Sequence, residues 1–249
     1  GDTKMFYHIN RAALGVNNNM LQLLYFERFS DSEENTYEVD LDFSDENEVI
    51  VDIYRKEILV NYNLDGEYLS HHILKDMVPF YDDENSNIQS AMMCMPVTDD
   101  NNNLYIRARH RKYIEREGNW ITDGLDYKDS RLYISKYDAN YNLLWEKSVG
   151  ASMGYDSKML IHKTGKLFID FDYSINADLS EFEENLFLNK GDSYNNGSGL
   201  IILDENGTLW GYKNFGNARY TDFYLSDSKL NISGPYKDNI TLNFENTTP

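Results

Sequence analysis

The order of apolar and polar residues along this chain repeats four times. In each repeat an apolar-rich stretch runs into a turn of Asp, Asn, Ser or Thr residues, and a second apolar stretch returns from it. In the first repeat Val39, Leu41 and Phe43 alternate with acidic residues, which is the period-two pattern of a strand. The pattern predicts four β-hairpins, over residues 37–54, 90–110, 158–173 and 220–236.

Each of the first three hairpins is followed by a further pair of strand-like stretches. These pairs begin at residues 57–63, 131–138 and 200–204, and a turn separates the two members of each pair. Two of the turns contain Asp65-Gly66 and Asn206-Gly207, dipeptides that favour the primed turns of two-residue hairpin loops. The predicted unit is therefore a meander of four antiparallel strands.

Half a unit stands at each end of the chain. Residues 5–10 and 20–28 resemble the last two strands of a unit, and residues 220–236 resemble the first two. Joined together they complete a unit and leave no free sheet edge, as in a closed β-propeller. We therefore predict an all-β fold, a β-propeller of four-stranded antiparallel blades. We expect four blades, closed by pairing of the N-terminal strands with the C-terminal hairpin; part of a larger propeller is the alternative.

The predicted blades divide the 249 residues of a single domain. Residues 182–189 align without gaps on residues 236–243, which favours short extra strands over the helix that the spacing of Leu179, Phe182 and Leu186 would indicate. The four blades are expected at residues 37–74, at 88–149, at 157–214, and at 220–236 combined with 5–28.

The formal net charge of −19 limits the partners of the chain. Nucleic acids and anionic membrane surfaces attract basic proteins, so we predict no nucleic-acid partner. No apolar run approaches the ~20 residues that span a bilayer, which predicts no membrane insertion. We expect a monomer whose partner is a protein or a carbohydrate.

Two acidic stretches raise the question of calcium. Residues 31–52 are rich in Asp and Glu, which a solvated sheet face explains better than a metal site. Asp99 begins a stretch that starts like a calcium loop, but Leu104 stands where the turning glycine belongs and His110 where the bidentate glutamate belongs. We predict a hairpin turn there and no cofactor or metal ligand, with calcium as the alternative.

Two signals of reactive side chains also have structural explanations. Residues 150–154 match the G-x-S-x-G nucleophile elbow, which requires a strand before the serine and a helix after it. No helix is predicted there, so Ser152 is interpreted as a loop serine. Cys94 is the single cysteine of the chain and lies in an apolar stretch, where it is expected to pack as a small apolar residue. We predict no catalytic residue.

One group of basic and aromatic residues opposes the acidic charge of the chain. It stands at the end of the second hairpin and in the insertion that follows, residues 111–130. Aromatic rings stack on sugars, and arginines bind carboxylate or sulfate. Ion pairs with acidic residues of neighbouring blades are the alternative explanation. The predicted ligand-binding residues are Arg107, Arg109, Arg111, Tyr113 and Trp120.

The second half of the chain carries a recognisable repeat. Its motifs are Ile134-Ser135-Lys136-Tyr137-Asp138, Asn142-Leu143-Leu144-Trp145 and Gly165-Lys166-Leu167-Phe168-Ile169, and a further copy includes Asp204-Glu205-Asn206-Gly207 and Leu230-Asn231-Ile232-Ser233-Gly234. This pattern resembles the bacterial SBBP-type β-propeller repeat, mainly over residues 131–244. It departs from the repeat at Tyr141, which stands where the turn glycine is expected. The resemblance implies secreted, periplasmic or cell-surface proteins that share no catalytic residues.

These patterns favour a non-catalytic binding or scaffold module, with a glycan or a protein as its ligand. The alternative is a glycan-acting enzyme, a hydrolase or lyase with carboxylates gathered near the propeller axis. Acidic residues are abundant in the chain, but the sequence does not fix the distance between any two carboxylates. We therefore expect binding without catalysis.

Overall fold

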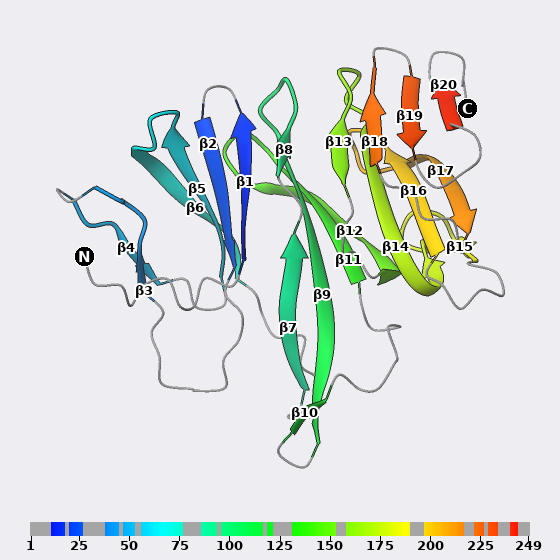
Figure 1. Cartoon of the computed structure of the whole chain (residues 1–249), viewed down its shortest axis with the longest axis horizontal. Helices are drawn as coiled ribbons and strands as arrows, with labels where there is room; N and C mark the ends of the chain where they lie inside the picture. Colours follow the sequence, from blue (N-terminus) through cyan, green and yellow to red (C-terminus); the bar gives the residue numbers. More distant parts are fainter. Residues whose placement is uncertain are drawn as a thin grey trace.

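The computed structural model describes residues 11–17, 20–26, 38–44, 47–52, 56–76, 86–93, 96–116, 119–121, 131–152, 158–189, 197–216, 222–226, 229–233 and 240–243. Within these ranges the regular structure consists of strands, with no helix, which confirms the predicted all-β class (Figure 1). The strands are β1 (Arg11–Asn17), β2 (Met20–Phe26), β3 (Glu38–Asp40), β4 (Ile50–Asp52), β5 (Lys56–Asn63), β6 (Tyr68–Asp76), β7 (Ser86–Met93), β8 (Val97–Thr98), β9 (Leu104–Arg116), β10 (Asn119–Ile121), β11 (Arg131–Tyr137), β12 (Leu143–Ser152), β13 (Met159–Ile161), β14 (Leu167–Asp178), β15 (Phe187–Leu188), β16 (Gly197–Leu203), β17 (Leu209–Gly216), β18 (Asp222–Leu225), β19 (Lys229–Ser233) and β20 (Ile240–Asn243).

Two four-stranded meanders form the centre of the structure. β8, β9, β11 and β12 are antiparallel neighbours in chain order, and β13, β14, β16 and β17 repeat this arrangement. Both follow the predicted unit of a hairpin and two further strands. β12 also meets β14, with Gly150 opposite Asp178, and this contact joins the two meanders into one hydrogen-bonded sheet. Ser152 is the last residue of β12, where the sequence predicted a loop.

The N-terminal strands are placed differently from the prediction. β1 covers residues that were expected to connect two strands, and the expected strand at residues 5–10 lies outside the described ranges. β2 pairs with β5 from Met20 opposite Asn63 to Phe26 opposite Glu57, which gives a sheet in the order β1–β2–β5–β6. β5 is buried along most of its length, so its main-chain groups need hydrogen-bond partners on both edges.

The first predicted hairpin does not supply that second partner. β3 and β4 form a separate two-stranded sheet, with Val39 opposite Val51. The two strands also carry Glu38, Asp40 and Asp52, and carboxylates are costly to bury beside a strand such as β5. The apolar strand β2 takes this place, and the prediction that residues 37–54 pair with the next strand is therefore wrong.

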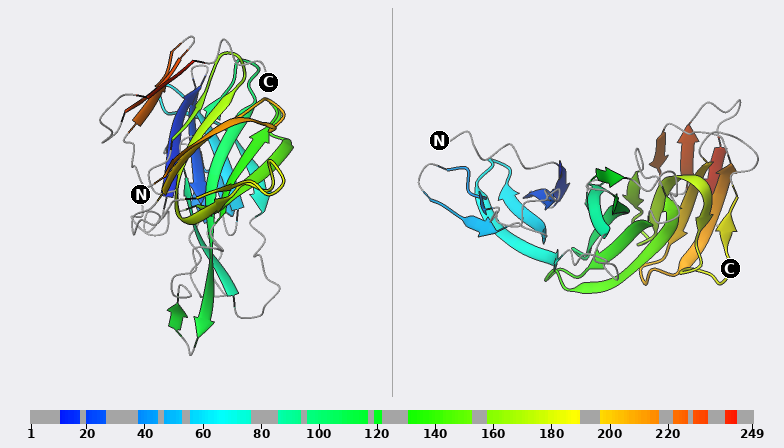
Figure 2. Two further views of the ribbon diagram at one scale, coloured as in Figure 1. Left: turned by 90° about the vertical axis from the view of Figure 1, so that its right-hand side faces the viewer. Right: turned by 90° about the horizontal axis from the view of Figure 1, so that it is seen from below.

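The predicted pairing of the N-terminal strands with the C-terminal hairpin is also wrong for the described residues. β18 and β19 pair with each other and with β20, whereas β1 and β2 belong to the sheet of β5 and β6. Figure 1 places these two sheets apart along the longest axis, with β9, β11 and β12 between them. The right-hand view of Figure 2 shows the sheets following one another along an open arc.

Apolar side chains hold successive sheets face to face. Four separate clusters of buried residues lie along the arc, each between two neighbouring layers. Burying one such leucine or phenylalanine contributes about 2 kcal/mol. Representative pairs, one from each cluster, are Val39 with Ile58, Leu59 with Ile106, Leu132 with Phe171, and Leu200 with Leu230.

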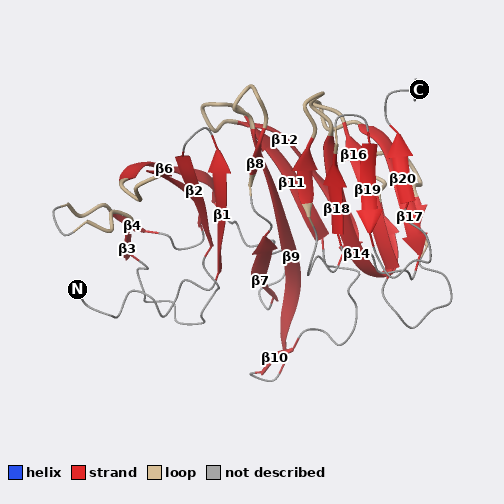
Figure 3. Cartoon of the chain, turned by 45° about the horizontal axis from the view of Figure 1, so that its top comes forward, coloured by secondary structure: helices blue, strands red, loops and turns tan. Residues whose placement is uncertain are grey.

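Five of the hairpin turns in the described ranges share one geometry. The main-chain N–H of the first residue donates to the carbonyl of the fifth, and the N–H of the fourth donates to the carbonyl of the first. The fourth residue of each turn has a positive φ. This is the three-residue loop of a type I turn followed by a left-handed residue, and the predicted primed two-residue turns are wrong because only one residue per turn has positive φ. The turns span residues 63–67, 99–103, 138–142, 162–166 and 204–208, and the last four gather along one end of the strands (Figure 3).

The predicted extra strands are present, and one is shorter than expected. In residues 182–189 only β15 is a strand, and it pairs with β14 at Ala177 and Asp178. The preceding residues form hydrogen-bonded turns, in which Asn185 has φ 60°. β20, in residues 236–243, pairs with β19 over its whole length. Both segments therefore extend a sheet, as the alignment of the two segments predicted.

Candidate ligand-binding site

Tyr141 occupies a backbone position that suits glycine. It is the fourth residue of the turn 138–142 and has φ 64°, whereas three of the five turns have glycine there. A bulky residue in this region carries a strain of about 1–3 kcal/mol. The Asp138 carboxylate stabilises the turn, because its Oδ1 accepts the N–H groups of Asn140 and Asn142 at 2.8 Å. The turn thereby holds the Tyr141 side chain against the neighbouring sheet.

The Tyr141 side chain bridges two sheets. Its ring lies on that of His72 of β6, with the ring centroids 3.9 Å apart, and its hydroxyl accepts a hydrogen bond from Asn61 Nδ2 of β5 (3.1 Å). Asn61 Nδ2 also donates to Ser70 Oγ (3.1 Å), and Asn61 Oδ1 accepts from Gln22 Nε2 of β2 (3.2 Å). Gln22, Asn61, Ser70, His72 and Tyr141 are called the junction cluster below.

The junction cluster combines buried anchors with accessible contact groups. Gln22 and Asn61 are each 3% exposed, whereas Ser70, His72 and Tyr141 are half-buried. Buried amides that hydrogen-bond to each other and to the outer groups fix the orientation of those groups. The result is a pre-organised surface of one hydroxyl, one imidazole and one phenol.

The junction cluster carries no formal charge at neutral pH. Burial lowers the pKa of His72, and the neighbouring His71 lowers it further, so the imidazole is neutral at pH 7. A neutral imidazole offers one donor and one acceptor nitrogen. His72 Nε2 lies 3.4 Å from Ser70 Oγ, and the Tyr141 hydroxyl, which accepts from Asn61, keeps its own proton to donate. The outer groups are therefore suited to a ligand rich in hydroxyl groups.

Arg107, the first of the predicted binding residues, lies in the interior. It is 1% exposed, and its Nη1 donates to the main-chain oxygen of Asp170 on β14 (3.2 Å). Its side chain is buried because β9 lies between two layers, the sheet of β2 and β5 on one side and that of β14 on the other. Its ligand-binding role stays a prediction.

The other predicted binding residues lie on strands whose side chains are outside the description. Arg109, Arg111 and Tyr113 occupy alternate positions on β9, and Trp120 lies on β10, opposite Glu115. β9 and β10 extend, together with β7, beyond the end of β11 (Figure 1). The ligand-binding role of these residues stays a prediction.

The stretch that begins like a calcium loop forms the hairpin turn 99–103. Asp99 Oδ1 accepts the N–H groups of Asn101 and Asn103, and Oδ2 accepts from Asn103 Nδ2 and from the Tyr105 hydroxyl. Hydrogen-bond donors therefore already surround this carboxylate. In the part of the chain that the structure describes, no three His, Cys, Asp or Glu residues are placed to share a metal ion. Cys94 lies outside that part, so its predicted packing stays a prediction.

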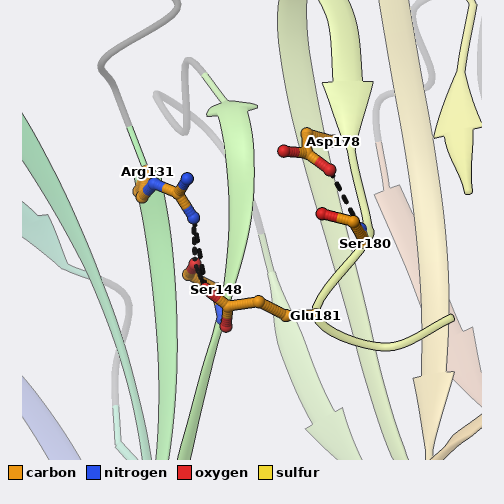
Figure 4. A network of polar contacts seen from close by, with 5 residues as sticks. All are labelled: Arg131, Ser148, Asp178, Ser180 and Glu181. Carbon is orange, nitrogen blue, oxygen red and sulfur yellow. Dashed lines mark hydrogen bonds and ion pairs between the residues drawn. The ribbon is translucent and has the colours of Figure 1, made fainter. Parts of the chain in front are cut away.

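A second polar network braces the middle of the structure (Figure 4). Glu181 follows β14 and accepts hydrogen bonds from the main-chain N–H and the hydroxyl of Ser148, both at 2.7 Å, and from Arg131 Nη1 at 3.2 Å. Nearby, Asp178 Oδ1 accepts the N–H of Ser180 (2.9 Å). The Glu181 carboxylate is engaged by three donors, so this network is a structural link rather than a site for a ligand or an acid–base step.

The turn at Asp138 makes stability depend on pH. Hydrogen bonds from the side chain and the main chain of Asn142 lower the pKa of Asp138. A lowered folded-state pKa stabilises the protein above the unfolded value of about 3.9, and this contribution is lost as the pH falls through the folded value. We expect Asp138→Asn to have a lower urea midpoint than the unmodified protein at pH 7 and the same midpoint at about pH 2. The exposed Asp65→Asn is the control, and an equal, pH-dependent loss in it would contradict this role of the turn.

The sequence alone does not indicate the junction cluster. The glycine-to-tyrosine departure at position 141 is its single visible trace, because the other members stand at ordinary strand positions in the first half of the chain. Adjacent His71 and His72 also gave no signal. They face opposite sides of β6, where His71 Nδ1 lies 2.7 Å from the Tyr68 hydroxyl.

Comparisons with known proteins leave the chain without a family. No family model and no curated protein matches it. A GH43 β-xylosidase/α-arabinofuranosidase from a compost microbial metagenome, solved with xylotriose, gives a TM-score of 0.46 at 11% identity, covering 96% of this chain and 74% of that one. A member of the DUF4221 family from Bacteroides vulgatus gives 0.28 at 11% identity, covering 98% and 95%. A eukaryotic initiation factor gives 0.31 at 10% identity, covering 95% and 55%.

All three TM-scores are below 0.5, so these likenesses establish neither a shared fold nor a shared function. Within the described ranges, no helix is long and apolar enough to cross a membrane.

Proposed function

We propose that this chain is a non-catalytic binding module of the β-propeller type and that its ligand is a neutral glycan. The observation that carries the proposal is the junction cluster. A buried amide holds its hydroxyl and phenol groups in place, and the imidazole lies against the phenol ring. Sites with a few fixed polar groups beside an aromatic ring suit sugars. The layered four-stranded meanders support the propeller architecture, and the resemblance to the SBBP-type repeat supports a secreted or cell-surface location.

The charge around the junction cluster favours a neutral ligand over an acidic one. The turn that presents Tyr141 carries Asp138, and the neighbouring turn 99–103 carries Asp99 and Asp100. The whole chain has a net charge of −19. An anionic sugar would approach against this field, whereas a neutral one would not. We therefore place uncharged, hydroxyl-rich glycans first among the ligands.

Glycan arrays followed by calorimetry on each bound glycan test the proposal. We expect His72→Ala to weaken binding about tenfold, because one well-placed hydrogen bond is worth about 1.4 kcal/mol. Tyr141→Phe removes only the hydroxyl and should weaken binding by a similar factor. Binding should also weaken as the pH falls through the lowered pKa of His72, since protonation removes the acceptor nitrogen.

Tyr224→Phe is the matched control, because Tyr224 is 58% exposed on β18, away from the junction cluster. Its affinity for the same glycan should equal that of the unmodified protein. An equal loss in all three variants, or no loss in any of them, would remove the junction cluster from the binding site. Release of reducing ends from a bound glycan would instead favour the glycan-acting enzyme.

A further inference from the structure

Arg107 is a buried cation to which the described residues supply no ionic partner. It is 1% exposed between β9 and β14, and within the described part of the chain it makes one hydrogen bond, from Nη1 to the carbonyl oxygen of Asp170. Among the described residues its Nε finds no hydrogen-bond partner, and the ion pairs between them do not include Arg107. The Asp170 carboxylate is engaged with another group, because its Oδ1 accepts the main-chain N–H of Lys158.

A guanidinium in this setting is incompletely satisfied. It keeps its charge in proteins and presents five N–H donors, and buried charges are normally paired. Arg107 lies on the same side of β9 as Tyr105, and Ile169 and Phe171 flank its acceptor Asp170; these three side chains belong to one apolar cluster. These apolar side chains supply no negative charge to the guanidinium, so this part of the interior favours an added anion.

We infer that Arg107 binds a small oxyanion, a carboxylate, phosphate or sulfate, in the interior between the two meanders. The planar guanidinium matches the geometry of these groups and binds them through two parallel hydrogen bonds. Positions 109 and 111 of β9 also hold arginines, and alternate positions of a strand share a face. Positions 107, 109 and 111 of β9 are therefore all basic in an otherwise acidic protein.

Thermal unfolding in matched salts tests this inference. The melting temperature of the full chain is measured in sodium phosphate, sulfate, acetate and chloride at equal ionic strength. We expect at least one oxyanion to raise it by about 5 °C over chloride once the site is saturated. A rise with phosphate and sulfate identifies a tetrahedral anion, and a rise with acetate identifies a carboxylate. The increase should saturate as the anion concentration is raised.

Arg107→Met should abolish this shift. Lys136→Met is the matched control, because Lys136 is a second buried cation, 6% exposed, but it donates to the Glu205 carbonyl (2.9 Å) and lies over the Tyr105 ring. Lys136→Met should keep the full oxyanion shift. If Arg107→Met does not fold, Arg107→Lys should show a reduced shift, because lysine lacks the planar fork.

Two results would overturn the inference. One is a shift in the unmodified protein that grows without saturation or is equally large in chloride, since that is a general salt effect. The other is a shift in Arg107→Met, or in Arg107→Lys where only that variant folds, equal to that of the unmodified protein. The junction cluster is not involved in this experiment, so glycan binding and oxyanion binding can fail independently.

Discussion

Replacing Phe171 with alanine is expected to lower the free energy of unfolding by about 4 kcal/mol, the cost of leaving a cavity in place of a buried phenyl ring. Phe171 is fully buried in the cluster between the two meanders, and its ring lies 6.0 Å from that of Tyr173. The loss is measured by urea unfolding, with circular dichroism as the probe. A loss below about 1 kcal/mol would contradict this packing.

The neighbouring Gly199 gives this prediction a sharper form. A methyl group on Gly199 would lie 2.8 Å from Phe171 Cζ and 3.0 Å from Leu188 Cδ1, so Gly199→Ala alone should cost about 2 kcal/mol through overpacking. In the Phe171→Ala background the same methyl group enters the cavity. We expect the double variant to lose about 4 kcal/mol rather than the sum of the two losses, a coupling of about 2 kcal/mol.

Gly211→Ala is the control for this cycle, because its methyl group would meet no atom within 4 Å. Combined with Phe171→Ala, it should add only its own small effect. A coupling as large as that of Gly199 would show that the effect does not come from the contact with Phe171.

Gly207→Ala is expected to cost about 3 kcal/mol, the largest effect among the turn glycines. Gly207 has φ 75°, a conformation that strains other residues by about 1 kcal/mol, and a methyl group there would approach the Trp145 ring to 2.9 Å. Trp145 is held against this turn by a hydrogen bond from Nε1 to the Glu205 carbonyl (3.1 Å). Urea unfolding followed by tryptophan fluorescence measures the loss.

Gly66→Ala separates the two causes of this loss. Gly66 has φ 87° in the same type of turn, but a methyl group there would meet nothing within 4 Å. It should therefore show the strain alone, about 1 kcal/mol. Equal losses in the two variants would mean that the contact with Trp145 contributes nothing to stability.

The local parts of the fold are well encoded in the sequence. Alternating residues and turn signals lie within a few positions of each other, so the two meanders and the positive φ of Gly66 and Gly207 are predictable. Which sheet a hairpin joins depends on contacts between residues far apart in the chain. Leu24 of β2 pairs with Leu59 of β5, and both side chains belong to the same apolar cluster. No local pattern in the sequence reveals that pairing. The predicted pairing of the N-terminal strands with the C-terminal hairpin was wrong for this reason.

The candidate site was harder to predict than the fold. The sequence drew attention to Arg107 because it belongs to a basic run, but a run of charges does not reveal that its first member lies between two packed sheets. Asn61 and His72 are 80 and 69 positions from Tyr141 along the chain, respectively, so only the folded turn brings them together. Burial and long-range contact decide both cases, and neither is visible in residue spacing.

The layered order of the sheets has a consequence for how the molecule opens. Each described apolar cluster joins only neighbouring layers, so an interior layer is held by two interfaces, whereas β3–β4 and the β18–β20 sheet are each held by one. In an array held by nearest-neighbour contacts, the units with one interface separate at the lowest free-energy cost. Opening therefore begins at the two ends of the arc, and the interface that contains Phe171 and Arg107 is among the last to separate.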